Sequence, residues 1–386
     1  MKKILAVALS ILMLLPFTFL FASAEATVLT ESELIFDEEG KFRIAVFADC
    51  QDDVFPDARM LKMIEYCIET EKPDFVVLDG DNICQPVYAL HNQAATTLLE
   101  SLAKAGVPFG FVFGNHDAET LSKDLIMQSF HNCGATCLTY NSDDSITGLG
   151  NCNLPVMSSD GSGEIAFNLF LIDSNMYDEV NGGYDYVHED QIEWYRNTSL
   201  ALEEAAGEKV YSLVFQHIIV PEIFDLMVEV EESEKQYTYN GKHYKYEFID
   251  GVTKSCENFG EQPCPPNTNH GQVDAMLERG DVLGIVTGHD HTNSFVVNYN
   301  GIDFIQTPGI TFQSYGAKEA RGYRIIDIDE ADTSTYTTYV VKYADVFDDG
   351  EKAITLEIIQ VTIREFFKLF TTLFKTIGNI IGIARS

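Results

Sequence analysis

The stretch FRIAVFADCQDD, from Phe42 to Asp53, joins a short apolar run to a cluster of acidic residues. Runs of this length that are rich in Val, Ile and Phe are typical of buried strands. Similar runs recur along the chain, and each is followed by Gly, Asn, Asp or His: DFVVLDGDN, PFGFVFGNHD, AFNLFLIDS, VYSLVFQH and DVLGIVTGHDH. The pattern therefore predicts buried strands whose ends carry the polar residues.

Helical periodicity separates the first of these strands. Residues 57–70 and 89–105 place apolar residues at three- and four-residue spacing, and Gly106 and Pro108 end the second segment. Alternating strands and helices predict an α/β fold. After Gly288 the apolar runs follow one another with short turns, which predicts a second, mostly antiparallel sheet.

Three further segments differ from this pattern. Residues 1–24 have two early lysines, an apolar run and a final small-x-small sequence, which predict a signal peptide and a secreted or cell-surface protein; an uncleaved anchor is the alternative. Residues 222–270 are polar with little periodicity, which suggests a surface insertion near the mouth of the site. Residues 356–386 are expected to form an amphipathic helix that suits a membrane surface or the protein's own sheet. One domain is expected over residues 40–345.

Composition limits the partners. The chain of 386 residues has 60 acidic and 25 basic residues, a formal net charge of −35, so no nucleic-acid polymer is expected to bind. The eight cysteines of an exported chain could form disulfides. Cys256 and Cys264 flank a short loop and suggest one pair, and Cys152 with Cys133 or Cys137 suggests a second.

The polar residues at the strand ends include the atoms that a metal centre needs. In an α/β sheet the carboxyl ends of the strands converge on one crevice. Two divalent ions ~3.5 to 4 Å apart need a shared carboxylate and further carboxylate, amide and imidazole ligands. The residues that offer these groups are Asp49, Gln51, Asp81, Asn115, His217, His289 and His291. Apart from His116, the histidines outside this set are expected at the surface or in the insertion: His91, His131, His188, His243 and His270.

Four short motifs carry a resemblance to a known family. GDN at residues 80–82, GNHD at 114–117, FQH ending at His217 and GHDH at 288–291 resemble, in the same order, the motifs of the calcineurin-like metallophosphoesterase superfamily. The longer segments GDNI, QHIIVPE and GHDHTNSF, which contain or extend these motifs, resemble those of the purple acid phosphatase-like branch of simplified form. The resemblance covers about residues 42–328. It implies a two-sheet α/β/β/α sandwich.

The resemblance also implies a role for each residue. The first metal would be held by Asp49, Gln51, Asp81 and His291, and the second by Asp81, Asn115, His217 and His289. The two divalent ions would be Mn, Mg, Fe, Zn or Ca, with Mn favoured. A hydroxide between them would hydrolyse a P–O bond of a phosphorylated small molecule or nucleotide. His116 would act at the leaving oxygen, and Asp117 would orient the His116 ring.

Gln51 stands where most of the superfamily has histidine. Strand alternation would point Asp49 and Gln51 to one face and Cys50 to the other. An amide oxygen is a hard, neutral ligand that favours Mn²⁺, Mg²⁺ or Ca²⁺. The Asp-x-Gln sequence also resembles manganese-dependent ADP-ribose/CDP-alcohol diphosphatases, so a nucleotide-linked pyrophosphate is an alternative substrate. A binding protein that has lost turnover on the same fold is the non-enzyme alternative.

Overall fold

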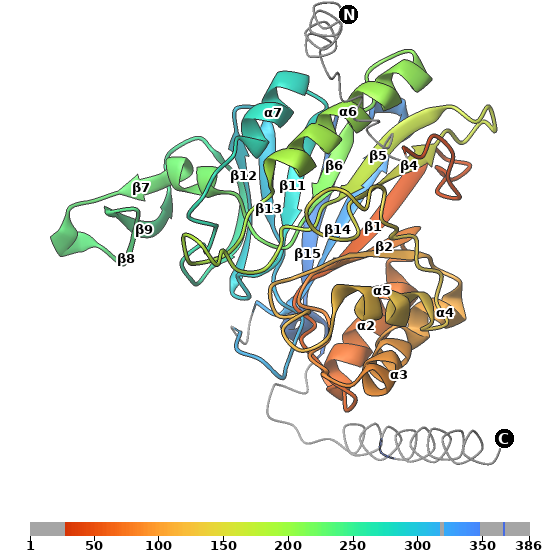
Figure 1. Ribbon diagram of the computed structural model, residues 1–386, viewed down its shortest axis with the longest axis horizontal. Coiled ribbons are helices and arrows are strands. Elements are labelled where there is room, and N and C mark those ends of the chain that lie inside the picture. The colour runs from red at the N-terminus through yellow and green to blue at the C-terminus, as the bar shows by residue number, and fades with distance from the viewer. Residues whose placement is uncertain (1–27, 317–319, 348–365, 367–386) are drawn as a thin grey trace, which may run out of the picture.

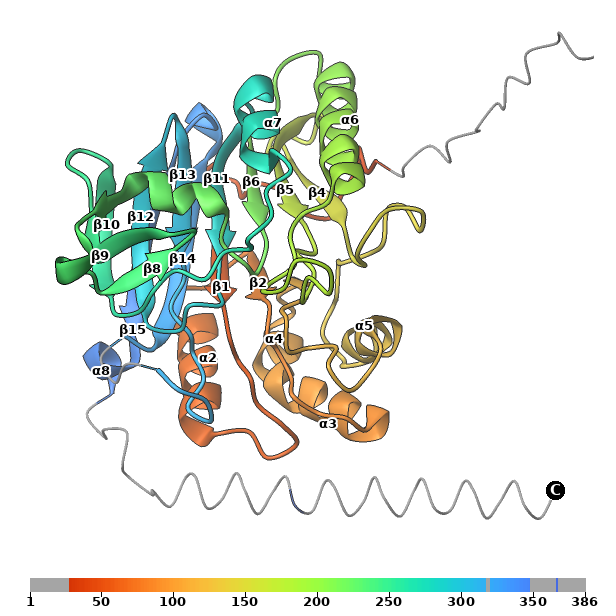
Figure 2. The ribbon, with the colours of Figure 1, turned by 60° about the vertical axis from the view of Figure 1, so that its left-hand side comes forward.

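A computed structural model describes residues 28–316, 320–347 and 366 of the chain (Figure 1). Within these residues two large β-sheets pack against each other, and helices cover their outer faces (Figures 1 and 2). The arrangement confirms the predicted two-sheet α/β/β/α sandwich.

The first sheet contains the strand that the opening stretch predicts. Among the described residues its order is β15 (Tyr336–Lys342), β14 (Gly322–Asp329), β1 (Lys41–Phe47), β2 (Phe75–Asp79) and β3 (Phe109–Val112). The strands β1, β2 and β3 are parallel, so their carboxyl ends lie at one edge. β14 pairs antiparallel with both β1 and β15.

The second sheet is also mixed. Its order in the described chain is β10 (Thr253–Phe259), β12 (Asn293–Tyr299), β13 (Ile302–Gln306), β11 (Val282–Thr287), β6 (Ser212–Phe215), β5 (Ile165–Leu171) and β4 (Cys152–Met157). The central strands β13, β11, β6 and β5 are parallel, and the outer strands pair antiparallel.

The prediction of a separate antiparallel sheet after Gly288 is wrong. β12 and β13 extend the second sheet, whereas β14 and β15 cross over to the first. β14 fits there because both of its faces are covered: Ile325 packs under the helices, and Ile326 and Ile328 pack between the sheets. Local sequence shows that such strands exist, but their partners depend on distant residues.

Three apolar layers hold the sandwich together. Residues between the sheets, such as Ile44, Val77 and Phe215, form the middle layer. The helices on the first sheet are α2 (Ala58–Thr70), α3 (Tyr88–Leu98), α4 (Glu100–Ala105) and α5 (Lys123–His131). The helices on the second sheet are α6 (Glu189–Ala206) and α7 (Gln272–Arg279). Among the described residues, no helix combines the length and apolarity needed to cross a bilayer.

The two predicted helices differ in outcome. α2 is confirmed, and Asp57 caps it by accepting a hydrogen bond from the Arg59 amide (2.9 Å). The predicted helix over residues 89–105 is divided at Leu99 into α3 and α4, and Gly106 ends it with a φ of 74°. His91 in α3 was expected at the surface, but it is fully buried against Ser129 of α5.

The insertion has more structure than its sequence predicted. A 3₁₀ helix (Pro221–Leu226) precedes a small sheet of β7 (Met227–Glu229), β9 (Lys242–Phe248) and β8 (Tyr237–Tyr239), which projects to one side in Figure 1. Its aromatic residues face inward: Phe224, Tyr237 and Tyr244 are buried together. Aromatic packing therefore orders a segment whose polar composition suggested a loop.

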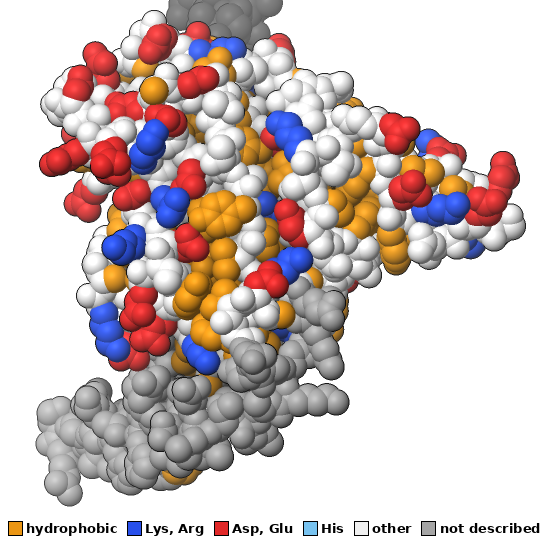
Figure 3. All heavy atoms as spheres, turned by 180° about the vertical axis from the view of Figure 1, so that it is seen from behind, with side chains coloured by type: hydrophobic (Ala, Val, Ile, Leu, Met, Phe, Trp, Pro, Cys, Tyr) orange, Lys and Arg blue, Asp and Glu red, His pale blue; other side chains and the backbone are white. Residues whose placement is uncertain are grey.

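Two predicted terminal segments are not described by the structure, and the predicted disulfides are absent from the described residues. The signal peptide at residues 1–24 and the helix at 356–386 lie outside the described residues. The eight cysteines are all described and all are free, so the two suggested disulfides are not formed. Cys256 is exposed on β10, whereas the Cys264 thiol donates to the Gln262 carbonyl (3.3 Å). Acidic side chains are spread over the rear face with basic ones between them (Figure 3).

Candidate metal centre

The predicted ligands follow the carboxyl ends of parallel strands from both sheets. Asp49, Asp81 and Asn115 follow β1, β2 and β3, while His217 and His289 follow β6 and β11. Backbone hydrogen bonds join these loops: the Asp49 amide donates to Gly80 (3.1 Å), and the Gly288 amide donates to His217 (3.1 Å). His217 Nδ1 also pairs with the Asp79 carbonyl (2.8 Å), so strand ends from the two sheets meet in one place, as expected for a crevice at the carboxyl edge.

Glycine is required where these loops approach each other. Gly80 has a φ of 86°, and a Cβ there would lie 2.3 Å from His217 Nδ1. A Cβ on Gly114 would lie 2.2 Å from Asp81 Oδ1. Any larger residue at either position would push a predicted ligand away from its place.

The argument from strand alternation at residues 49–51 is wrong. β1 ends at Phe47, and both Asp49 (φ 53°) and Gln51 (φ 34°) adopt left-handed backbone conformations. Cys50 still points into the apolar core between these two residues. The Gln51 side chain reaches the site, where its Nε2 donates a hydrogen bond to Asp81 Oδ2 (2.8 Å).

One group of predicted ligands already has the spacing of a cation site. Single ligand atoms of Asp81, His217 and His289 lie within 4.8 Å of one another. His217 Nδ1 pairs with the Asp79 carbonyl (2.8 Å), which aims Nε2 at Asp81 Oδ2, 3.4 Å away. A carbonyl behind a ligating histidine fixes its ring orientation in metal sites.

A second group lies around Asp49. His291 Nε2 is 3.3 Å from Asp49 Oδ1, and His291 Nδ1 pairs with the Tyr315 carbonyl (2.9 Å). The Tyr315 ring stacks on the imidazole at 4.1 Å between centroids. The other Asp49 oxygen accepts the His289 amide (3.0 Å), which leaves Oδ1 for the site.

Several buried atoms of the predicted ligands are available to bind a cation. Four of them have no hydrogen-bond partner among the described residues: Asp49 Oδ1, Asn115 Oδ1, His217 Nε2 and His289 Nε2. An unsatisfied buried polar atom costs about 1–3 kcal/mol, so four in one place indicate a missing partner. Asn115 is oriented for this role because its Nδ2 donates to the Tyr177 hydroxyl (3.1 Å), which leaves the oxygen free.

Electrostatics point the same way. Burial opposes ionisation of Asp81, but the charge of the neighbouring His217 holds the pKa of Asp81 below its usual range. Burial disfavours the charged form of His217, yet Asp81 and Asp49 raise the pKa of His217 to about 10. Burial likewise disfavours charged His291, but Asp49 raises the pKa of His291 to about 9. Asp49 and Asp81 therefore stabilise positive charge next to them. Divalent cations would supply more of that charge than protonated histidines do.

The expected role of Asp117 needs correction. Asp117 is buried and accepts hydrogen bonds from the amides of Gly114 (2.8 Å), Asn82 (2.8 Å) and Ile83 (3.3 Å). Burial raises the pKa of its carboxyl to about 6, and Asp81 adds to the shift. Asp117 thus ties the loop after β2 to the loop after β3, and the His116 ring has other partners.

Glu119 and Tyr177 are the partners of His116 that sequence reasoning missed. His116 Nδ1 pairs with Glu119 Oε1 (2.9 Å), and the Tyr177 hydroxyl donates to the same oxygen (2.8 Å). The His116 side chain is 43% exposed, so its ring stands at the open side of the site. Spacing of three residues between His116 and Glu119 was the available signal, but the adjacent carboxylate of Asp117 was the more obvious choice.

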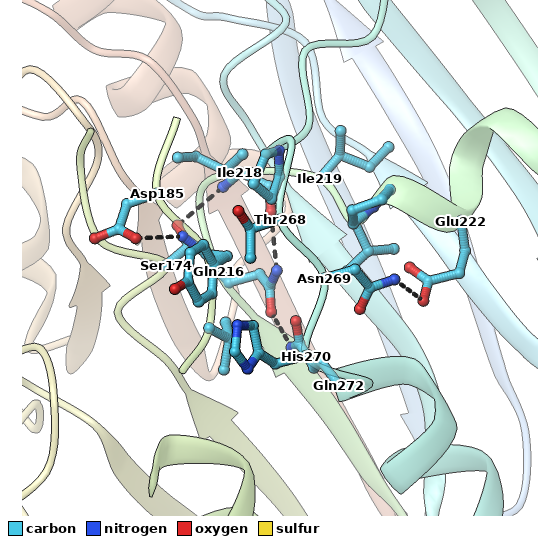
Figure 4. A pocket seen from close by; sticks show the side chains of 15 residues that line it. Ser174, Asp185, Gln216, Ile218, Ile219, Glu222, Thr268, Asn269, His270 and Gln272 are labelled. Carbon is cyan, nitrogen blue, oxygen red and sulfur yellow. Dashed lines mark hydrogen bonds between the residues drawn. The ribbon is translucent and has the colours of Figure 1, made fainter. Parts of the chain in front are cut away.

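A separate pocket is lined by Gln216, which follows β6, and by Gln272 at the start of α7 (Figure 4). Its polar groups largely pair with each other: Gln272 Nε2 donates to Gln216, and Asn269 Nδ2 donates to Glu222 (2.7 Å). His270, considered above among the outlying histidines, lines this pocket and stacks on Tyr186 at 4.7 Å.

Comparison with known proteins agrees with the motifs. The family model of calcineurin-like phosphoesterase matches residues 42–293. Two similar proteins of Arabidopsis thaliana are named probable inactive purple acid phosphatases 14 and 29. The first is 28% identical to this chain, and the alignment covers 76% of this chain and 77% of the plant protein. The second is 25% identical and covers 77% and 79%.

Among solved structures, a dimetal phosphatase from Danio rerio aligns with a TM-score of 0.46 and 15% identity. The alignment covers 78% of this chain and 99% of that one.

Proposed function

The chain belongs to the calcineurin-like phosphoesterase family, and on that premise we propose that it hydrolyses phosphate ester P–O bonds at a dinuclear metal centre. The observation that supports this most is the set of four buried, unpartnered ligand atoms at converging strand ends. Two bound divalent cations would neutralise phosphoryl charge and lower the pKa of a water molecule.

The proposed ligands divide as the resemblance implies. Asp49, Gln51, Asp81 and His291 would hold the first ion, and Asp81, Asn115, His217 and His289 the second. The short distance from His291 to Asp49 and the grouping of Asp81 with His217 and His289 support this division. Oxygen ligands from Asp49, Asp81 and Asn115 favour Mn²⁺ over softer ions.

His116 is the proposed proton donor to the leaving oxygen. Glu119 and Tyr177 contact its Nδ1, which would leave Nε2 available to a substrate. A proton on Nε2 would pass to the leaving alkoxide as the P–O bond breaks. Glu119 is then a positioning residue, because it acts through His116.

The first test separates an enzyme from a binding protein. The purified chain with added Mn²⁺ should hydrolyse p-nitrophenyl phosphate or its bis-ester, and Asp49→Asn combined with His217→Ala should remove both activity and bound metal. His131→Ala, an exposed histidine of α5, is the matched control. The non-enzyme alternative is relevant because the similar plant proteins carry the word inactive in their names. Two bound ions without any phosphoester or pyrophosphate hydrolysis would establish that alternative.

The substrate remains a phosphorylated small molecule or nucleotide. A diphosphatase acting on ADP-ribose or CDP-alcohols is the second candidate, because Gln51 of the Asp-x-Gln sequence contacts the proposed bridging residue Asp81. Hydrolysis of ADP-ribose, CDP-choline and simple monoesters should be measured side by side. A higher kcat/KM for the first two would favour the diphosphatase.

A further inference from the structure

A second group of metal-binding side chains lies beside the proposed centre. Single ligand atoms of Cys264, His289 and Asp290 lie within 4.8 Å of one another. Asp290 is 1% exposed, and its Oδ2 has no hydrogen-bond partner within the described chain. A buried carboxylate oxygen beside a thiol and an imidazole therefore lacks the partner that such an atom requires.

The backbone holds Cys264 beside the GHDH turn. The amides of Gly260 (3.0 Å) and Glu261 (3.1 Å) both donate to Asn293 Oδ1. In return the Thr292 amide donates to Glu261 Oε1 (2.6 Å). These bonds tie residues 260 and 261, shortly before Cys264, to residues 292 and 293, directly after the GHDH turn, and the three side chains already lie together.

We propose that Cys264, His289 and Asp290 form an auxiliary site for a thiophilic divalent cation such as Zn²⁺. Thiolate, imidazole and carboxylate are each ligands that zinc takes in proteins, and three protein ligands with a fourth position for water are a known arrangement. A soft thiolate selects Zn²⁺ or Co²⁺ over Mn²⁺ and Mg²⁺, which the oxygen-rich centre at the strand ends favours. Binding would convert the Cys264 thiol to a thiolate and release its proton to solvent.

The auxiliary site would compete with the proposed centre. His289 belongs to both groups of three residues, and a neutral imidazole offers one lone pair to a metal. An ion at Cys264 would therefore withdraw His289 from the second metal position. This consequence rests on the proposed dinuclear centre, whereas the binding of a thiophilic cation at Cys264 does not.

Cobalt absorption tests the site directly. Co²⁺ added to the full chain should give a thiolate-to-cobalt charge-transfer band that Cys264→Ser removes. Cys256→Ser, an exposed cysteine on β10, is the matched control and should keep the band. Asp290→Asn should weaken Co²⁺ binding at least tenfold, because even the loss of a group that only supports a metal ligand costs about 10- to 100-fold in affinity. Absence of the band at saturating Co²⁺ in the wild-type chain, or its persistence in Cys264→Ser, would overturn the proposal.

The competition between the two sites for His289 can be measured without an activity assay. Protein loaded with Mn²⁺ is titrated with Zn²⁺, and free Mn²⁺ is followed by electron paramagnetic resonance. Displacement should need about tenfold more Zn²⁺ in Cys264→Ser and in Cys264→Ala than in the wild type or Cys256→Ser. Identical displacement curves in all four proteins would refute the competition, and this result leaves the hydrolase proposal unaffected.

Discussion

Asp81 is the residue at which the parts of the site meet. Gln51 Nε2 donates to one of its oxygens (2.8 Å), the His116 amide donates to the other (2.8 Å), and His217 lies 3.4 Å away. A carboxylate with this many fixed neighbours keeps its orientation without a cation. Gln51 therefore contributes to the site through Asp81, and direct ligation by its amide oxygen stays a prediction.

Replacement of Gln51 tests that contribution. Gln51→Ala removes one hydrogen bond to a charged group, worth about 1.5–3 kcal/mol, so Mn²⁺ affinity should fall roughly tenfold or more while binding persists. Gln51→His should shift the preference toward Zn²⁺, since imidazole is the softer ligand. Calorimetric titration of each variant measures both effects, with Gln128→Ala, an exposed glutamine of α5, as control. Unchanged Mn²⁺ affinity in Gln51→Ala would contradict the contribution.

Replacement of Glu119 tests the arrangement around His116. A poor leaving group needs a proton, whereas p-nitrophenolate leaves without one. Glu119→Gln should therefore lower kcat at least tenfold for an alkyl phosphate and less than twofold for p-nitrophenyl phosphate, with little change in KM. Glu189→Gln is the matched control because Glu189 pairs with His270 in the same way (3.0 Å) away from these residues. An equal loss on both substrates would point to a structural role for Glu119.

The individual site residues were more predictable than their contacts. Motif order placed Asp49, Asp81 and His217 correctly at strand ends, because short apolar runs followed by polar residues are a local signal. The left-handed backbone at Asp49 and Gln51 was not predictable, since neither is glycine. Glu119 was missed because the partner of a ring depends on side-chain directions that spacing alone does not give.

At the scale of elements, α3 and α5 meet at a buried histidine. His91 Nδ1 pairs with Ser129 Oγ (2.8 Å), and burial lowers the pKa of His91 to about 4. The unfolded chain binds the proton near pH 6.5, so stability is complete above that pH and falls as the pH drops toward 4. The loss from this residue should reach about 2–3 kcal/mol at pH 4.5.

A variant isolates this effect from the other titrating groups. The free energy of unfolding in urea is measured at pH 7.5 and 4.5 for the wild type, His91→Gln and His131→Gln. The difference between the two pH values should shrink in His91→Gln alone, because His131 is exposed. Equal differences in all three proteins would mean that the packing of α3 against α5 does not depend on neutral His91.

The insertion was expected to have little periodicity, but its small sheet contains a strand pattern. Tyr244, Tyr246 and Phe248 alternate along β9, which is a strand signal of period two. Their partners are Phe224, Tyr237 and Phe259, so the pattern becomes meaningful only when distant segments come together. The same limit explains why β14 and β15 were assigned to the wrong sheet.

At the scale of the whole molecule, the proposed centre joins the two sheets. Asp49, Asp81 and Asn115 come from the first sheet, whereas His217, His289 and His291 come from the second. Cations bound only by the folded state stabilise it by about 2.7 kcal/mol at a hundredfold excess over Kd. Mn²⁺ should therefore raise the Tm by several degrees and chelation should lower it.

Calorimetric scans with Mn²⁺ and with a chelator measure this stabilisation. The pair Asp49→Asn and His217→Ala removes one ligand from each sheet and should abolish the Mn²⁺ effect, while His131→Ala should keep it. A rise in Tm that survives in the double variant would place the stabilising ion elsewhere.

The net charge of the whole molecule opposes contact with an anionic membrane, whereas the proposed C-terminal helix favours it. A body with a net charge of −35 is repelled by an anionic surface, whereas residues 356–386 place Arg364, Lys368 and Lys375 opposite Phe and Ile in the proposed helix. The full chain should therefore float with vesicles that contain phosphatidylserine, and a chain ending at Phe347 should not. Basic residues near a surface act within about 10 Å at 0.1 M salt, so binding should weaken as salt rises. Full-length protein that stays with the unbound fraction at low salt would instead favour a helix packed on the protein's own sheet.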